Sequence, residues 1–184
     1  MAIPENATKV HSWILIDVYQ REQEMFDGSY KTFEKAVRPD GVYCIPIFGD
    51  KICMAHDRQP GIDPWVTLIG GRVDKWLNLE DTMKAELSEE WWITCDSLEL
   101  YKSYTIPWKL EYQQHIYIAR WCAIDHDPHL DTWWEDITLI YKSFDEFIDT
   151  CCTNNDLILF TNHLLKMKFY WGIEEFKNLL FNIN

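Results

Sequence analysis

Glycine and basic residues are scarce in this sequence of 184 residues. It contains seven glycines, whereas average usage would give about thirteen. Lys and Arg together number 17 against 30 Asp and Glu. The formal net charge of −13 excludes a protein that coats nucleic acid through a basic surface, because such an acidic chain repels phosphates. It does not exclude a small phosphate-bearing molecule, since a metal ion can lie between two sets of negative charges.

Several targeting and metal-binding signals are also missing. No run approaches the roughly eighteen apolar residues of a membrane span, and the first ten residues lack the charged and apolar stretches of a secretory signal. The six cysteines form no CxxC pair and lie mostly in apolar stretches, which favours buried, reduced thiols in a cytoplasmic protein. A metal or redox role for the adjacent Cys151 and Cys152 is the alternative, but adjacent cysteines lack the usual ligand spacing.

The length fits one domain, because domains hold roughly 150 residues, and a hydrophobic fraction of 47% is enough to build a core. Short β-rich runs dominate the first seventy residues. A helical period then begins, in which Leu79, Met83 and Leu87 recur every four residues. We expect strands at residues 13–19, 30–37, 42–48, 51–55, 65–69, 116–123 and 137–141, and helices beginning at 79 and 143 and spanning 156–170 and 173–181.

Two of these helices carry recognisable start signals. Asn78 fits an N-cap, and Glu80 and Asp81 follow in the first turn, where the helix dipole favours negative charge. Ser143 is followed three residues later by Glu146, which is the spacing of a capping box. Both helices are therefore expected to begin where these residues stand.

Residues 70–93 carry the most informative pattern, GGRVDKWLNLEDTMKAELSEEWWI. On a helix, Glu86, Glu89 and Glu90 lie at i, i+3 and i+4 and project from one side. Like charges at that spacing repel, so a sequence with no use for them usually avoids the cluster. Such carboxylates can share Mg²⁺ or Mn²⁺, and the preceding Gly-Gly pair lets backbone approach a phosphate or a metal. A plain solvated acidic face is the alternative interpretation.

The full spacing resembles the Nudix box, in which a Gly is followed after five residues by Glu and after seven more by Arg-Glu-apolar-x-Glu-Glu-x-Gly-apolar. Counted from Gly71, the box is kept without a gap, but Leu77 stands at its first Glu, Ala85 at its Arg and Trp92 at its closing Gly. The positions that match in register are Glu86, Leu87, Glu89, Glu90 and Ile93.

The flanking segments resemble the ADP-ribose pyrophosphatase-like branch of that superfamily. These segments are VYQREQEMFDGSYKTFEKAVRPDGV before the box, and HIYIAR followed by WEDITLIYKSFDEFID after it. The resemblance covers residues 13 to 150, and the helices expected from residue 156 onward match nothing in it.

The resemblance implies an α+β fold, the Nudix α/β/α sandwich with a mixed sheet between helices. It implies a single domain, residues 1–184, with an N-terminal strand pair at 13–40, the box at 70–93 and C-terminal helices at 155–184. It also implies a homodimer, because the N-terminal strands of this branch commonly pack against the partner subunit. An exposed apolar strand pair would otherwise leave an edge open to pairing.

The implied reaction is metal-assisted attack of water on a pyrophosphate linkage, which splits a nucleoside diphosphate from another group. ADP-ribose or a nucleotide sugar is the implied substrate, and Mg²⁺ or Mn²⁺ the implied cofactor, which lowers the pKa of a bound water. The implied metal ligands are Glu86, Glu90 and the Gly70 carbonyl, with Glu89 as a third ligand or as a catalytic base.

Four further residues are candidates for the site. Glu135 occupies the loop position where this branch often carries its catalytic carboxylate, although a surface acid is the alternative. Arg58, Arg72 and Arg120 are candidates for substrate contacts, because arginine binds phosphate oxygens bidentately. Ordinary surface charge is the alternative for these arginines.

Leu77 and Ala85 depart from the box at residues that mainly orient the metal-binding glutamates. The loss of such supporting partners typically costs about 10- to 100-fold in affinity or activity. The alternative function is therefore a catalytically silent Nudix-fold module that binds a nucleotide and regulates another process. A purely structural interaction domain is a third reading, but it leaves the acidic register unexplained.

Four of the ten tryptophans stand where the resembling pattern has glycine: Trp76, Trp92, Trp121 and Trp134. Tryptophan is strained wherever φ must be positive. One hypothesis explains both the excess of tryptophan and the shortage of glycine: the native gene uses UGA for glycine, and this chain reads UGA as tryptophan. The alternative is a divergent protein with aromatic residues on a binding surface.

Overall fold

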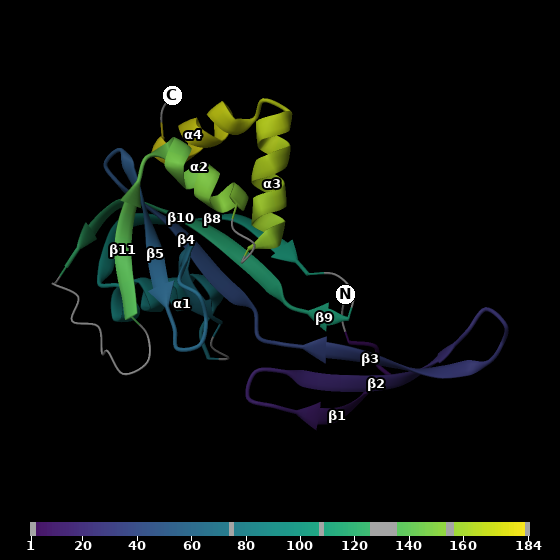
Figure 1. The fold of residues 1–184 in the computed structure, drawn as a ribbon. Helices are drawn as coiled ribbons and strands as arrows, with labels where there is room; N and C mark the ends of the chain where they lie inside the picture. Colours follow the sequence, from purple (N-terminus) through teal and green to yellow (C-terminus); the bar gives the residue numbers. More distant parts are fainter. Residues whose placement is uncertain (1–2, 74–75, 107–108, 126–135, 154–156, 183–184) are drawn as a thin grey trace.

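A seven-stranded sheet forms the body of the protein (Figure 1). Its strands are β4 (Gly41–Phe48), β5 (Lys51–Arg58), β6 (Trp65–Thr67), β7 (Ile69–Arg72), β8 (Ile93–Thr105), β10 (Gln113–Ile124) and β11 (Asp136–Lys142). The computed structural model describes residues 3–73, 76–106, 109–125, 136–153 and 157–182. The main strand order is β11-β5-β4-β10-β8, while β6 pairs with β5 and β7 with β4. The sheet is mixed, because β4 and β10 run parallel while β8 pairs antiparallel with β10.

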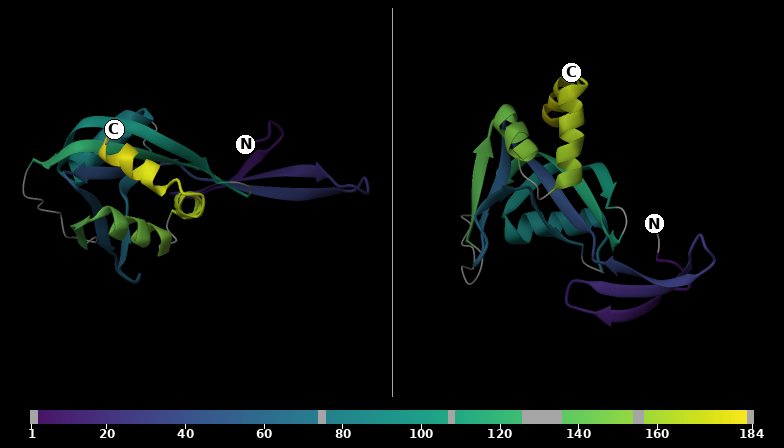
Figure 2. Two further views of the ribbon diagram at one scale, coloured as in Figure 1. Left: turned by 90° about the horizontal axis from the view of Figure 1, so that it is seen from above. Right: turned by 45° about the vertical axis from the view of Figure 1, so that its right-hand side comes forward.

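A second sheet projects from the body as an arm, residues 8–37 (Figures 1 and 2). It contains β1 (Thr8–Ser12), β2 (Asp17–Glu24) and β3 (Tyr30–Val37), and β3 also pairs in parallel with the short β9 (Leu110–Glu111). Gly28 follows Asp27 and adopts a φ of 79° in the turn between β2 and β3, a position where Asp-Gly pairs are favoured. An ion pair between Lys35 and Glu111 also joins the arm to the body.

Side chains of the central strands alternate between the two faces of the body sheet, so each face buries its own apolar cluster. On β4, Ile45 and Ile47 belong to one cluster, whereas Val42 and Cys44 belong to the other. The strands β5 and β10 alternate in the same way. A sheet that is apolar on both faces requires cover on both.

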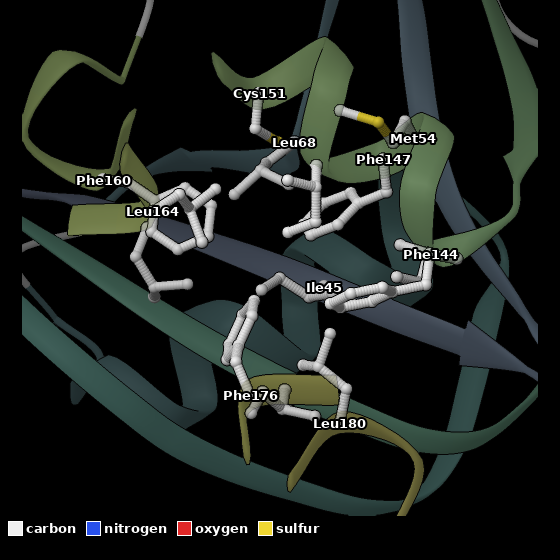
Figure 3. Packing of buried hydrophobic residues seen from close by; sticks show 14 of the residues in the cluster. Ile45, Met54, Leu68, Phe144, Phe147, Cys151, Phe160, Leu164, Phe176 and Leu180 are labelled. Atoms are coloured by element: carbon white, nitrogen blue, oxygen red, sulfur yellow. The ribbon is translucent and has the colours of Figure 1, made fainter. Parts of the chain in front are cut away.

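Helices supply that cover. On one face lie α2 (Phe144–Thr153), α3 (Ile158–Phe169) and α4 (Ile173–Phe181), which bury Phe147, Phe160 and Phe176 against β4, β5 and β10 (Figure 3). The other face is covered by α1 (Leu79–Ala85) and by the π-helical turn η1 (Glu86–Glu90) that continues it. The expected arrangement of a mixed sheet between helices is confirmed.

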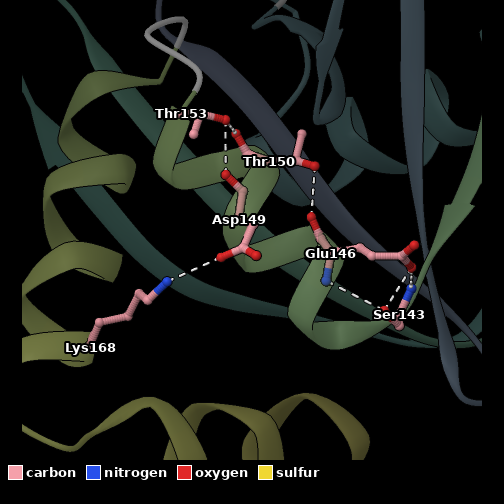
Figure 4. A network of polar contacts seen from close by, with 6 residues as sticks. All are labelled: Ser143, Glu146, Asp149, Thr150, Thr153 and Lys168. Atoms are coloured by element: carbon pink, nitrogen blue, oxygen red, sulfur yellow. Dashed lines mark hydrogen bonds and ion pairs between the residues drawn. The ribbon is translucent and has the colours of Figure 1, made fainter.

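The polar surface of α2 shows how this layer is fixed (Figure 4). The Ser143 backbone N–H and hydroxyl both donate to the Glu146 carboxylate, at 2.8 and 2.7 Å, and these bonds lower the pKa of Glu146. The expected capping box is therefore present. In the middle of α2, Asp149 accepts from Lys168 of α3 at 3.1 Å, and this contact joins the two helices.

The strands differ from the sequence predictions in two places. Residues 13–16 do not belong to a strand: they form the turn between β1 and β2, which the Trp13 N–H closes by donating to the Ile16 carbonyl at 2.8 Å. The long strand β8 was not expected, although its run of Thr, Leu and Tyr residues is typical of strands. No helix in the described residues is both long enough and apolar enough to cross a membrane.

Candidate active site

The candidate site begins where β7 passes the π-helical turn. Gly70 and Gly71 lie in β7 opposite Tyr43 and Val42 of β4. A β-carbon at Gly70 would lie 2.7 Å from the Tyr43 α-carbon, so only glycine permits this approach of the two strands. A β-carbon at Gly71 would overlap the Glu86 carboxylate. The Gly-Gly pair therefore seats this glutamate directly against the backbone of β7.

The segment that carries the glutamates is fixed at its N-terminal end and along its buried side. The Asn78 side-chain oxygen accepts from the Asp81 N–H at 2.8 Å, which confirms the expected N-cap. Met83 and Leu87 are buried in the cluster beneath the sheet and hold the opposite side of the segment. The helix was expected to continue as regular α-helix, but residues Glu86–Glu90 form a π-helical turn. Such turns are rare and frequently mark functional sites.

A cleft of about 1040 Å³ opens beside this segment. The described residues of its wall come from three regions of the sequence. These are residues 9–17, which include the turn between β1 and β2, residues 37–39, where the arm joins the body, and residues 71–89. Glu86 and Glu89 both line it, and so does Arg72. The arm of the same chain therefore forms one wall, and the acidic turn forms another.

The cleft carries both signs of charge. Cationic side chains in its wall are Lys9, Arg38 and Arg72. The Arg38 guanidinium stacks 4.6 Å from the centre of the Tyr112 ring, which limits its freedom before any ligand arrives. Lys9 pairs with Asp17 at 2.7 Å. Sequence reasoning missed Arg38 and Lys9, because no motif or spacing connects them with residues 70–93.

Aromatic side chains add apolar surface to the same wall. Trp13 lies in the turn between β1 and β2 and is 65% exposed, while Trp76 precedes α1 and is 89% exposed. Leu77 and Ala85, two of the three departures from the box, also line the cleft. Apolar side chains therefore stand where the box has a Glu and an Arg.

Two of the predicted arginines do not lie in this cleft wall. Arg120 is buried on β10 and donates to the carbonyls of Leu179 and Leu180 at 2.8 and 3.2 Å and to Glu99 at 2.9 Å. Its guanidinium therefore caps the C-terminal end of α4 in this structure, away from the cleft wall, and its contact with substrate stays a prediction. Arg58 ends β5 as an exposed residue outside the cleft wall. Glu135 and the side chain of Glu90 lie outside the described part of the chain.

The donor set suits a hard cation. Among the described side chains, no three His, Cys, Asp or Glu residues lie close enough to form a metal-binding group. Glu86 and Glu89 nevertheless place two carboxylates in one cleft wall. Mg²⁺ is commonly held by one or two carboxylates together with substrate phosphates while it keeps several waters. The residues present therefore fit Mg²⁺ or Mn²⁺ better than a metal that needs a full protein cage.

Backbone conformation bears on the glycine hypothesis. Trp92 and Trp121 have φ values of 55° and 54°, in the left-handed region that favours glycine. Trp171, which the sequence did not single out, has a φ of 64°. Trp134 lies outside the described residues. Left-handed backbone is therefore established at Trp92 and Trp121 of the proposed positions and at one further tryptophan.

Comparison with known proteins finds a likeness in fold but none in sequence. No protein-family model matches the chain, and no curated protein matches it in sequence. Among solved structures, the crystal structure of an ADP compounds hydrolase aligns with a TM-score of 0.69 and 15% identity. The alignment covers 91% of this chain and 94% of that one. The likeness shows the fold alone, and the expected α+β sandwich with a mixed sheet between helices is confirmed.

Proposed function

We propose that this chain is a metal-dependent hydrolase that cleaves the pyrophosphate of a nucleoside diphosphate joined to another group, most simply ADP-ribose or a nucleotide sugar. The observation that carries the proposal is the seat of the Glu86 carboxylate against Gly71, in the wall of a cleft that also holds Glu89 and Arg72. On a helix face that only contacts solvent, a glutamate carboxylate would not be expected to lie against the backbone of a neighbouring strand. The fold of an ADP compounds hydrolase supports the proposal at the level of architecture.

Each cleft residue has a role that follows from its chemistry. Glu86 and Glu89, with Glu90 and the Gly70 carbonyl, would hold Mg²⁺ or Mn²⁺, which neutralises phosphate oxygens and lowers the pKa of a bound water. Glu89, more exposed than Glu86, would act as a third ligand or as the base. Arg72 and Arg38 offer donors to the diphosphate. Trp13 and Trp76 offer flat apolar faces to a nucleobase.

The direct test is release of phosphate from ADP-ribose in the presence of a phosphatase, with Mg²⁺ and with a chelator. We expect Mg²⁺-dependent release that Glu86→Gln reduces at least 100-fold, because the amide keeps the shape of the carboxylate but loses its charge. Glu174→Gln in α4 changes the same group far from the cleft and serves as the matched control. Equal rates for Glu86→Gln and the unchanged chain would contradict the proposal.

A catalytically silent nucleotide-binding module is the second candidate. It is favoured by Leu77 and Ala85, which place apolar side chains in the cleft wall where the box has a Glu and an Arg. Calorimetric titration separates the two functions. Binding of ADP-ribose without turnover at any Mg²⁺ or Mn²⁺ concentration supports the module, whereas turnover supports the enzyme.

We also propose that the chain forms a homodimer through its arm. Ile14 is 95% exposed and Phe26, at the turn between β2 and β3, is fully exposed, and β1 is exposed along its whole length at the edge of the sheet. Such an edge is open to pairing. Light scattering should give twice the chain mass, and Phe26→Ser should weaken the dimer more than Phe169→Ser, an equally drastic change on exposed α3. A monomer mass at micromolar concentration would contradict this proposal.

A further inference from the structure

Two cysteines face each other across the antiparallel pair β8 and β10. Cys95 and Cys122 are directly opposite in the register of these strands. Opposite residues of an antiparallel pair point to the same face of a sheet, and both side chains pack against the apolar cluster that includes Leu87. Both are partly exposed, and neither forms a disulfide in this structure.

This placement satisfies the main geometric requirement of a disulfide. Directly opposite residues in antiparallel strands have α-carbons about 4.5–5.5 Å apart, and disulfides span about 4.4–6.8 Å. The Cys122 thiol donates to the Ala119 carbonyl at 3.4 Å. Closure of a bridge requires that thiol to rotate away from this weak bond.

The other thiols are less suitable. Cys44 and Cys53 are fully buried under the sheet, so a reagent in solvent cannot reach them directly. Cys151 and Cys152 are adjacent in α2, and Cys151 points into the apolar cluster between α2 and the sheet (Figure 3). Cys95 also lines an open groove of about 680 Å³ beside α1, which gives solvent access to its sulfur.

We propose that Cys95 and Cys122 form an oxidisable pair that closes to a cross-strand disulfide on reaction with a small-molecule disulfide. The Cys95 thiolate attacks one sulfur of the reagent and releases one small thiolate. The Cys122 thiolate then attacks the Cys95 sulfur and releases the second small thiolate. Two protein thiols are oxidised, one reagent disulfide is reduced, and the two thiol protons pass to the released thiolates.

Burial and a nearby charge favour Cys95 as the first thiol to react. Burial raises the pKa of Cys95, while the nearby Lys84 ammonium lowers it. Burial raises the pKa of Cys122 further, to about 12. Cys95 is therefore the attacking thiol, and the reaction accelerates as the pH rises because the thiolate is the nucleophile. The resulting bridge would fasten the start of β8, which follows directly on the turn that carries Glu86 and Glu89.

The experiment treats the full-length chain with glutathione disulfide at pH 8.5 and maps the products by mass spectrometry after blocking free thiols. The expected result is a loss of two hydrogen atoms from the intact mass, with Cys95 and Cys122 in one linked peptide pair. Cys95→Ser should abolish the linkage, whereas Cys152→Ser, a change at a similarly half-buried thiol, should leave it intact. Cys122→Ser should stop the reaction at a glutathione adduct on Cys95.

Three outcomes would overturn the proposal. The first is an unchanged mass after prolonged treatment. The second is a stable glutathione adduct on Cys95 of the unsubstituted chain, which would show that Cys122 does not reach it. The third is a linkage that joins Cys122 to Cys44 or joins two chains. None of these outcomes depends on hydrolase activity, so the pair is tested separately from the proposed function.

Discussion

The Glu86 carboxylate occupies the space that a β-carbon on residue 71 would fill. The two residues are fifteen positions apart in the sequence, yet the contact is closer than any side chain at position 71 would permit. It fixes the distance between the π-helical turn and β7, and so the position of the acidic wall of the cleft. Gly71 is thus a positioning residue of the site, separate from any role of its backbone toward a ligand.

Gly71→Ala should therefore displace Glu86. We expect a loss of about 1–3 kcal/mol in the free energy of unfolding from overpacking, and a fall in hydrolysis on the order of 100-fold, because a misplacement of about 1 Å is enough for that. Gly172→Ala is the matched control, since its β-carbon would meet nothing closer than 3.8 Å. Urea unfolding and ADP-ribose hydrolysis measure the two effects. Equal behaviour of the two variants would contradict this account.

Metal binding should appear in the thermal stability of the chain. Mg²⁺ or Mn²⁺ that binds the folded state alone raises the melting temperature by mass action. We expect this rise in the unchanged chain and much less of it in Glu86→Gln, measured by differential scanning fluorimetry against metal concentration. Glu90→Gln should behave like Glu86→Gln, whereas Glu174→Gln in α4 should keep the full rise. An equal rise in all variants would mean that the acidic turn is only a solvated surface.

Local patterns predicted the parts of the fold that depend on local chemistry. The caps at Asn78 and Ser143 lie where their spacing places them, and the alternation of β4 follows from its own residues. Apolar residues at 13–16 favoured a strand, but they form an exposed turn. Their exposure depends on how the arm and the cleft are arranged. That arrangement involves segments that are distant in the sequence, so a short stretch of residues does not reveal it.

The differences in the site have the same origin. Arg120 was expected to contact phosphate, but its acceptors are carbonyls about sixty positions further along the chain, at the end of α4. The π-helical form of Glu86–Glu90 differs from an α-helix by one position in its hydrogen bonds, which helical periodicity does not resolve. Arg38 enters the cleft only because the arm joins the body there. Each difference depends on contacts between distant segments.

His163 should make stability depend on pH. Its Nε2 lies 2.8 Å from the Tyr101 hydroxyl, which joins α3 to β8. Burial first, and then Lys102 and Lys166, lower the pKa of His163 below its usual 6.5. The unfolded chain therefore binds the proton more readily. The stabilising contribution is complete above about pH 6.5, the unfolded value, and is lost as the pH falls through the folded pKa.

The measurement is urea unfolding at pH 7.5, 6.5 and 5.5 for the unchanged chain and for His163→Gln. We expect the free energy of unfolding to fall less steeply with acidification in His163→Gln, because the amide does not titrate. His11→Gln, which removes an exposed histidine in β1, should retain the steeper dependence. If the free energy of unfolding depends on pH equally in His163→Gln and His11→Gln, His163 is not the source of the pH dependence.

Trp92, Trp121 and Trp171 should each be improved by glycine. A side chain in the left-handed region costs about 1–2 kcal/mol, and Trp171 stands at the position after α3 where helices commonly end in glycine. There the Gly172 N–H donates to the Met167 carbonyl at 2.9 Å. Trp121 and Trp171 are 60% and 87% exposed, so their removal loses little burial. We expect each replacement by glycine to raise the free energy of unfolding by about 1 kcal/mol.

Trp13→Gly is the control that separates strain from the mere loss of a tryptophan. Trp13 is 65% exposed and is not in the left-handed region, so glycine should bring no gain there and should loosen the backbone. Trp92→Gly should in addition raise hydrolysis, because residue 92 ends the segment that carries Glu86 and Glu89. Urea unfolding of the four single variants, with sequencing of the source gene, tests the hypothesis twice. UGG codons at 76, 92, 121 and 134 would reject recoding. A gain for Trp13→Gly equal to the others would reject backbone strain as the cause of the gain.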